Sequence, residues 1–261
     1  MSTAIEVRDV WKAFHDRRTS RTVLAVEDVS FDVADGEFVC LVGPSGCGKT
    51  TMLRILAGLE TATTGSFRIV GGGRPGMVFQ DASIFPWLTV EENIGYPLAI
   101  AKVPEAKRRG RVDALLELTG LTDFRRALPH TLSGGMKQRT AVARALVDDR
   151  EILLMDEPFG ALDEQTRVVL QQELLRIWGA TGKSVVFITH SVDEALTLAD
   201  RVLVMSARPG RITAEVSIPF QRPRDVLELR LDPRYGEITY QIWSLLRAGG
   251  PAEPVAAGEP A

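Results

Sequence analysis

The stretch EFVCLVGPSGCGKTTMLRILAGL, residues 37–59, decides the fold of this chain. Its first six residues form an apolar run that is typical of a buried strand. A glycine-rich segment follows at residues 43–51, and apolar side chains then recur at helical spacing as far as Leu59. A strand, a glycine-rich turn and a helix in direct succession predict a loop that binds an anion at the edge of a parallel sheet.

The glycine-rich segment has the spacing GxxxxGK[ST], as GPSGCGKT at residues 43–50. Glycines let the backbone amides and the start of the following helix point at a chain of phosphates. In such a loop Lys49 reaches the β- and γ-phosphates of a nucleotide, and the hydroxyl of Thr50 binds Mg²⁺. The loop alone is compatible with a kinase, a GTPase or a transport ATPase. We expect a nucleotide to be bound by Gly43, Pro44, Ser45, Gly46, Cys47, Gly48, Lys49, Thr50 and Thr51.

The composition is that of an ordinary globular protein. Hydrophobic residues make up 45% of the 261 residues and charged residues 25%, which fits one large domain or two small ones. The formal net charge of -3 gives no electrostatic reason to expect nucleic acid as a partner. Cys40 and Cys47 do not suit a structural disulfide, which favours a reducing cytoplasm. Because the sequence shows no basic leader and no apolar run of roughly 20 residues, we expect a soluble chain.

Short apolar runs alternate with helical patterns, which predicts an α/β fold with a largely parallel sheet. The segments before the phosphate loop are typical of antiparallel hairpins, which residues 67–70 are expected to join. Residues from about 81 to 140 have a weak strand signal and an amphipathic helix, so we interpret them as a helical insertion. We expect a main domain at 1–210, a C-terminal extension with a helix at 211–248, and a disordered tail at 249–261.

Two acidic residues, Asp156 and Glu157, directly follow the apolar run ILLM. Asp156 has the position for holding Mg²⁺, directly or through water. Glu157 is expected to face the γ-phosphate as the general base for an attacking water. The alternative is a solvated acidic turn at the end of a strand, but the phosphate loop upstream favours the functional reading. A second carboxylate here indicates hydrolysis by water rather than transfer of a phosphate to another substrate.

At this point the chain resembles the ATP-binding-cassette family, whose motifs occur in order over about residues 5–210. The phosphate loop and ILLMDEP correspond to its two Walker motifs. VFQD places the family's glutamine at Gln80, GALD places its aspartate at Asp163, and ITH places its switch histidine at His190. LSGGMKQR at residues 132–139 is the signature that separates this family from other P-loop proteins. The resemblance implies a P-loop NTPase core of the RecA-like type, with an N-terminal antiparallel β subdomain and an inserted helical subdomain.

The resemblance also implies roles for residues that would otherwise have ordinary structural readings. Gln80 is expected to sense the metal and the attacking water and to relay their state. His190 is expected to contact the γ-phosphate as a neutral imidazole and to hold Glu157 in position. Phe14 stands where the family carries an aromatic side chain that stacks on adenine, although aromatic residues near the N-terminus are more often part of the core. Catalysis is thus assigned to Glu157, His190 and Gln80, and metal binding to Thr50, Gln80 and Asp156.

The signature implies a dimer. In this family Ser133, Gly134 and Gly135 face away from the phosphate loop of their own chain and close on the γ-phosphate bound by a second copy. A serine hydroxyl, glycine amides and a helix N-terminus suit an anion, which supports this interpretation. Together with Asp163 they are expected to complete the ATP site in a head-to-tail homodimer that ATP holds together.

A transporter built on this chain would require separate permease subunits, because the sequence shows no apolar segment of membrane-spanning length. Residues 81–98, DASIFPWLTVEENIGYPL, lie where the family docks its membrane partner. Phe85, Pro86 and Trp87 are apolar in a segment that otherwise has the composition of a surface, which is typical of a partner site. The alternative is that Trp87 packs into the core of the helical insertion.

Further segments, PWLTVEENI, MSARPGRI, IPFQRPRD and YQIWSLL, are similar to the ATPase subunits of nitrate, taurine, aliphatic-sulfonate and bicarbonate importers. This implies a peripheral ATPase at the cytoplasmic face of the membrane. It would drive the uptake of a small anion that a periplasmic or extracellular solute-binding protein delivers. The alternatives are a soluble cassette protein that acts on ribosomes or nucleic acid, and an exporter subunit. Soluble cassette proteins usually have two cassettes or a long coiled-coil insertion, and this sequence has neither.

Overall fold

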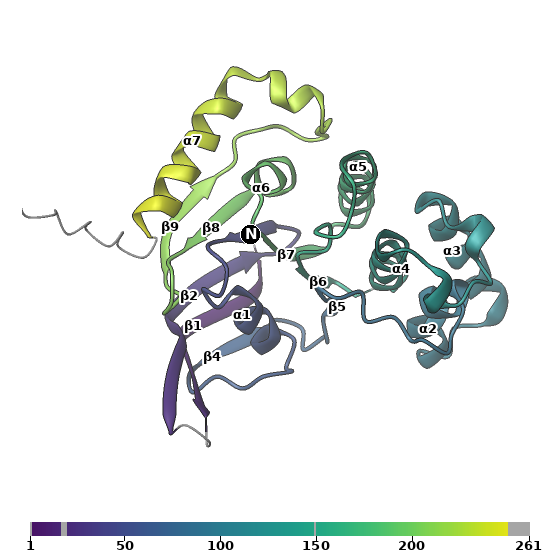
Figure 1. The fold of residues 1–261 in the computed structure, drawn as a ribbon, viewed down its shortest axis with the longest axis horizontal. Helices are drawn as coiled ribbons and strands as arrows, with labels where there is room; N and C mark the ends of the chain where they lie inside the picture. Colours follow the sequence, from purple (N-terminus) through teal and green to yellow (C-terminus); the bar gives the residue numbers. More distant parts are fainter. Residues whose placement is uncertain (1, 17–19, 149, 250–261) are drawn as a thin grey trace, which may run out of the picture.

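The structure, a computed structural model, describes residues 2–16, 20–148 and 150–249. The chain forms two β-sheets, and a group of helices lies to one side of them (Figure 1). The larger sheet has six strands in the order β5-β6-β7-β3-β8-β9, and the smaller has three in the order β2-β1-β4. The predicted α/β architecture is confirmed.

The central, six-stranded sheet is mostly parallel. Its strands are β3 (Phe38–Val42), β5 (Gly76–Val78), β6 (Ile152–Asp156), β7 (Ser184–Thr189), β8 (Arg201–Met205) and β9 (Ile212–Ser217). Neighbouring strands from β5 to β8 pair in parallel, and β9 pairs antiparallel with β8 at the edge. Every residue of β3, β6 and β7 is buried, as expected where both faces of a parallel sheet are covered. Because Val42 pairs with Thr189 and Asp156 with Ile188, the residues that follow these strands meet at one edge.

The smaller sheet consists of β1 (Thr3–Asp16), β2 (Arg21–Ala34) and β4 (Thr64–Ile69). β1 pairs antiparallel with both neighbours, so the predicted hairpin and the strand expected to join it are confirmed. The apolar side chains of the smaller sheet share one core with the central sheet and with α1 (Lys49–Leu56). Val7, Val26, Leu53 and Ile188 are among the residues of this core. This packing brings β2 close to the start of α1.

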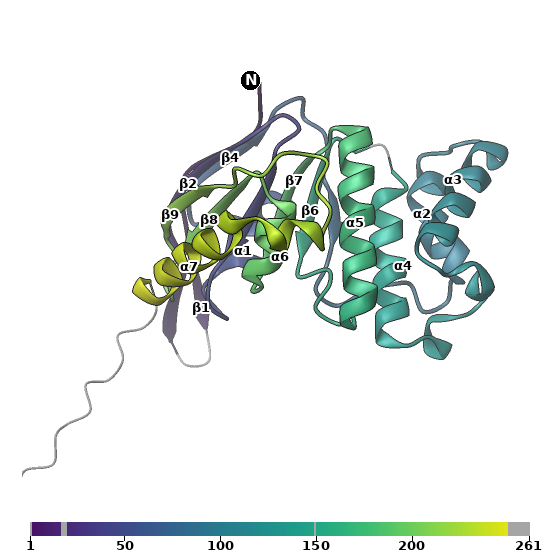
Figure 2. The same cartoon turned by 90° about the horizontal axis from the view of Figure 1, so that it is seen from above.

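The remaining helices are α2 (Val90–Ile100), α3 (Glu105–Leu118), α4 (Gly134–Leu146), α5 (Glu164–Thr181), α6 (Val192–Leu198) and α7 (Pro233–Ala248), with short 3-10 helices at Thr122–Phe124, Pro129–Thr131 and Glu228–Leu231. α2, α3 and α4 lie at the end of the molecule away from the smaller sheet, and α4 runs beside α5 (Figure 2). None of the helices in the described ranges is long and apolar enough to cross a membrane.

The helices α2 to α4 occupy the segment interpreted as a helical insertion, and α4 continues past residue 140 to Leu146. The predicted limit of the main domain, residue 210, falls just before β9, which adds the last strand to the central sheet. The tail expected to be disordered, 249–261, lies outside the described residues apart from Gly249. The division into domains therefore stays a prediction.

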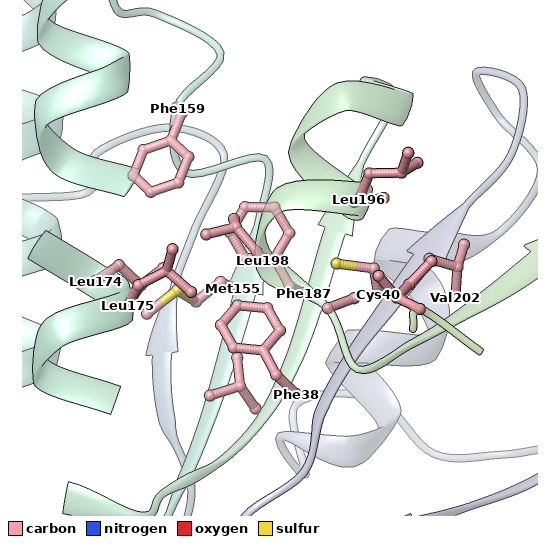
Figure 3. Close-up of a cluster of buried hydrophobic side chains, with 14 of the residues drawn as sticks. Phe38, Cys40, Met155, Phe159, Leu174, Leu175, Phe187, Leu196, Leu198 and Val202 are labelled. Atoms are coloured by element: carbon pink, nitrogen blue, oxygen red, sulfur yellow. The ribbon is translucent and has the colours of Figure 1, made fainter. Parts of the chain in front are cut away.

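The largest core lies between the central sheet and the helices α5 and α6 (Figure 3). Phe38, Phe159 and Phe187 are fully buried there. The ring centroid of Phe187 lies 5.8 Å from that of Phe38 and 5.7 Å from that of Phe159, within the range of favourable aromatic pairs. The thiol of Cys40 is in the same core, where burial raises its pKa. Both Cys40 and Cys47 are free thiols that form no disulfide, as expected.

Truncation of a central aromatic side chain should destabilise the folded protein. We expect Phe187→Ala to lower the free energy of unfolding by about 3–5 kcal/mol, because it leaves a cavity between two other rings. Phe124→Ala is the control, since 45% of that side chain is exposed, and it should cost less than about 1 kcal/mol. Urea denaturation followed by circular dichroism measures both variants. Equal effects would show that this aromatic cluster does not organise the core.

Candidate functional site

The phosphate loop lines a pocket with a volume of about 310 Å³. The other walls come from β1 and β2 and from the segments that follow β5, β6 and β8. The lining residues are Phe14, Val23, Ala25, Ser45, Gly46, Cys47, Gly48, Lys49, Thr50, Thr51, Gln80, Glu157 and Arg208. The pocket therefore lies at the carboxyl edge of the parallel sheet, where such sheets bind their ligands.

The phosphate loop keeps its shape because side chains are excluded at two of its positions. Gly48 has a φ of +106°, a left-handed conformation that other residues rarely adopt. A Cβ on Gly48 would lie 2.6 Å from the carbonyl oxygen of Ala25 in β2. A Cβ on Gly43 would lie 2.9 Å from the carbonyl oxygen of Met205 in β8. The loop is thus packed against strands of both sheets, and it leads directly into the N-terminus of α1, which favours anions.

Lys49 carries a buried positive charge at the base of the pocket. Its ammonium Nζ donates hydrogen bonds to the carbonyl oxygens of Gly43 at 2.7 Å and of Pro44 at 3.1 Å, both in the same loop. Among the described residues, no carboxylate forms an ion pair with this ammonium. Because a buried charge is costly without an ionic partner, the site favours an anionic ligand such as a phosphate.

Thr50 and Asp156 form a pair of oxygen donors beside the loop. The Thr50 hydroxyl donates to Oδ1 of Asp156 at 3.1 Å, and burial raises the pKa of this carboxyl. Mg²⁺ is usually held by one or two protein oxygens together with phosphate oxygens and water, so this pair fits it. Within the described ranges, no group of three or more His, Cys, Asp and Glu side chains could hold a metal. The arrangement suits a metal shared with the phosphates of a ligand.

Glu157 adopts a strained backbone conformation. Its φ of +44° is in the left-handed region, which costs a non-glycine residue on the order of 1–3 kcal/mol. Its amide donates to the carbonyl oxygen of Ile188 in β7 at 3.0 Å, which holds this turn in place. Its Oε2 accepts a hydrogen bond from Nε2 of Gln80 at 3.3 Å and lies 3.2 Å from Nδ1 of His190. The three side chains expected to act in catalysis therefore meet at one oxygen atom.

The residues of the signature lie elsewhere. Ser133 caps α4, since its Oγ accepts a hydrogen bond of 3.3 Å from the backbone amide three residues later. Neither Ser133 nor the next two residues, Gly134 and Gly135, line the pocket of the same chain. Asp163 caps α5 in the same way, with a hydrogen bond of 2.9 Å from a backbone amide that lowers its pKa. The structure thus leaves these four residues outside the chain's own pocket.

Phe14 lies in the pocket wall with 41% of its surface exposed, and Nζ of Lys12 lies 4.8 Å from its ring centroid. An exposed ring at this position is available for stacking.

Three lining residues were not predicted from the sequence: Val23, Ala25 and Arg208. Arg208 belongs to the segment MSARPGRI, but no spacing rule indicates that this arginine reaches the phosphate loop.

Comparisons with known proteins agree with one another. A family model described as "ABC transporter" matches residues 26–160. The uncharacterized ABC transporter ATP-binding protein MJ0412 of Methanocaldococcus jannaschii is 46% identical over 231 residues, which cover 86% of this chain and 86% of that protein. The taurine import ATP-binding protein TauB of Roseobacter denitrificans is 43% identical over 236 residues, 85% of this chain and 88% of its own length.

A solved structure of another protein is also similar to this chain. The dimeric structure of a post-hydrolysis state of the ATP-binding cassette MJ0796 bound to ADP and Pi gives a TM-score of 0.76 at 30% identity. The match covers 83% of this chain and 100% of that chain. The predicted P-loop NTPase fold is thereby confirmed.

Removal of the Thr50 hydroxyl tests the metal site. For wild type we expect Mg²⁺ to tighten the binding of ATP, and for Thr50→Val we expect this gain to fall by at least about tenfold, because a metal ligand is lost. Thr50→Ser keeps the hydroxyl and should keep most of the gain. Isothermal titration with ATP, with Mg²⁺ and with EDTA, measures the effect. A Val variant with the full gain would rule out Thr50 as a metal ligand.

Proposed function

The chain belongs to the ABC transporter family, and we propose that it is the ATP-hydrolysing subunit of an importer for a small anion. As a member of this family it binds ATP, and it is an ATP hydrolase coupled to transport. The observation that carries the proposed mechanism is the meeting of Gln80 and His190 at the carboxylate of Glu157, in the wall of the phosphate-loop pocket.

Glu157 is the proposed general base. About one fifth of its side chain, 21%, is exposed, so a water molecule has access to it. Removal of a proton from that water would make it nucleophilic toward the γ-phosphate. The contacts with Gln80 and His190 restrain one oxygen of the carboxylate, Oε2, which is how positioning residues raise the rate of such a step.

The nucleotide is proposed to lie along the pocket. Lys49 and the amides of the phosphate loop would bind the phosphates, and the ring of Phe14 would stack on adenine. Bound Mg²⁺ would neutralise part of the phosphate charge, and Thr50 and Asp156, with Gln80 nearby, would hold it.

The active form is proposed to be a head-to-tail homodimer. Ser133, Gly134 and Gly135 lie at the N-terminus of α4, away from the chain's own pocket, so they are available to the phosphate bound by a second copy. Asp163 is expected beside them at the same interface. The similar cassette MJ0796 is dimeric in a structure with ADP and Pi, which supports this arrangement.

The proposed membrane partner docks at the helical insertion, about residues 81–140 of the main domain. Trp87 is 72% exposed, so the alternative that it packs into the core of this segment is wrong. The ring centroid of the half-buried Phe85 lies 5.6 Å from that of Trp87 and 4.5 Å from that of Tyr96, and the rings of Trp87 and Tyr96 are exposed. Such a group favours contact with permease subunits, and it would place the chain peripherally at the cytoplasmic face of the membrane.

The proposed cargo is a small anion such as taurine, nitrate, an aliphatic sulfonate or bicarbonate, delivered by an external solute-binding protein. Relatives named as taurine import ATP-binding proteins are 40% to 43% identical and match 85% to 94% of this chain, which supports a cargo of this class.

Glu157→Gln should separate ATP binding from hydrolysis. The amide keeps the shape of the side chain but cannot accept the proton, so we expect turnover to fall by at least about 10²-fold while ATP still binds. The uncleaved nucleotide should then hold two copies together. Light scattering at saturating ATP measures the mass, and a variant that stays monomeric would contradict the proposed dimer.

Uptake assays test the proposed cargo class. A host strain that lacks this chain should lose uptake of one radiolabelled anion from a panel of taurine, nitrate, aliphatic sulfonate and bicarbonate. Wild type and the control Arg247→Ala, at an exposed position on α7 outside the proposed docking segment, should restore uptake, whereas Lys49→Ala should not, because it lacks the phosphate-binding cation. If the strain takes up all four anions normally, the proposed cargo is wrong.

A further inference from the structure

Arg208 reaches the nucleotide pocket from a distant part of the chain. It lies in the loop between β8 and β9, 162 residues after Gly46. Its Nε donates a hydrogen bond to the carbonyl oxygen of Gly46 at 3.3 Å, and the side chain lines the same pocket as Lys49 and Phe14. Among the described residues the guanidinium makes no further hydrogen bond, so its two terminal amino groups remain available to a ligand.

The charge of Arg208 has no carboxylate partner among the described residues. This sets it apart from Arg211 in the same loop, which forms an ion pair with Glu27. It also differs from Arg201 at the start of β8, which pairs with Glu37 and Glu215. An unpaired guanidinium in the wall of a phosphate-loop pocket is suited to an anion, and its planar fork matches phosphate oxygens.

The loop that carries Arg208 is held in place by hydrogen bonds, including one within the loop. The amide of Gly210 donates to the carbonyl oxygen of Ala25 at 3.0 Å, and the Ser206 hydroxyl donates to the carbonyl oxygen of Pro209 at 2.9 Å. The amide of Ala207 donates to the carbonyl oxygen of Gly249, just after α7, at 2.7 Å. Such fixed backbone reduces the entropy that is lost when a side chain engages a ligand.

The same loop is packed directly against the phosphate loop. A Cβ on Gly210 would lie 1.9 Å from the carbonyl oxygen of Cys47, so no other residue fits there. The guanidinium Nη2 of Arg208 lies 3.5 Å from the position that a Cβ on Gly46 would occupy. Arg208 is therefore next to the backbone expected to hold the phosphates, whereas Phe14, expected to stack on adenine, belongs to β1.

We propose that Arg208 is a further nucleotide-binding residue, whose guanidinium pairs with the phosphate chain of ATP or ADP across the phosphate loop. The proposal rests on the proposed placement of the nucleotide in this pocket. Arg208 supplies a second positive charge beside Lys49, from a loop that belongs to none of the nucleotide-binding motifs recognised in the sequence.

Arg208→Gln tests the proposal, because glutamine removes the charge but keeps a donor for the carbonyl of Gly46. The dissociation constants for ATP and ADP, measured by isothermal titration, should rise by about 3- to 10-fold, as expected when one partly exposed charged contact is lost. The affinity should also become less sensitive to added salt. Arg211→Gln is the matched control, with the same change of charge in the same loop but outside the pocket, and its dissociation constants should stay within about twofold of wild type.

Some results of this experiment would overturn the role of Arg208, and another would overturn the nucleotide site as a whole. Wild-type affinity in Arg208→Gln, or an equal loss in Arg211→Gln, would overturn the proposal. So would a clear drop in the melting temperature of Arg208→Gln without nucleotide, because the residue would then act on the loop's stability rather than on the ligand. Failure of the wild-type chain to bind ATP would instead contradict the proposed nucleotide site itself.

Discussion

The fixed backbone of the phosphate loop is the constraint on which the rest of the structure depends. Gly43 and Gly48 have no room for a side chain, because carbonyl oxygens of β8 and β2 lie against them. The loop is therefore held between two sheets that share a core with α1, and α1 begins at a defined position and direction. Parallel pairing then brings the ends of β6 and β7 to the same edge, where Asp156, Glu157 and His190 lie. The proposed hydrolytic mechanism would use all of these groups within reach of one phosphate chain.

Only some of the groups expected to act on ATP lie in the pocket of a single chain. Its pocket contains the cation of Lys49 and the carboxylate of Glu157. The serine and glycines of the signature lie at the start of α4, outside that pocket, as exposed or half-buried residues. A helix start with free amides is suited to an anion that its own chain does not present. This separation is the physical reason to expect that two copies share each ATP, and that binding of ATP and assembly of the pair are coupled.

Local patterns were sufficient to predict much of the fold and of the site. The buried strands β3, β6 and β7 have short apolar runs. Glu157 and His190 directly follow strands and Gln80 lies two residues after one, so their meeting could be expected. Contacts set by tertiary packing could not be predicted. No glycine marks the left-handed backbone of Glu157, and no turn residue marks the end of α4 at Leu146. The approach of Arg208 to Gly46 depends on how β8 pairs with β3, over a separation of 162 residues.

The central claim is that neither copy of the chain has a complete reaction centre. The most direct test measures the rate of ATP hydrolysis per molecule of the isolated chain over a wide range of protein concentrations. The account predicts that this specific rate falls on dilution, as pairs dissociate, and that Ser133→Glu abolishes it at every concentration by placing a negative charge against the γ-phosphate of the partner. A specific rate that does not change on dilution, and that Ser133→Glu leaves intact, would contradict it.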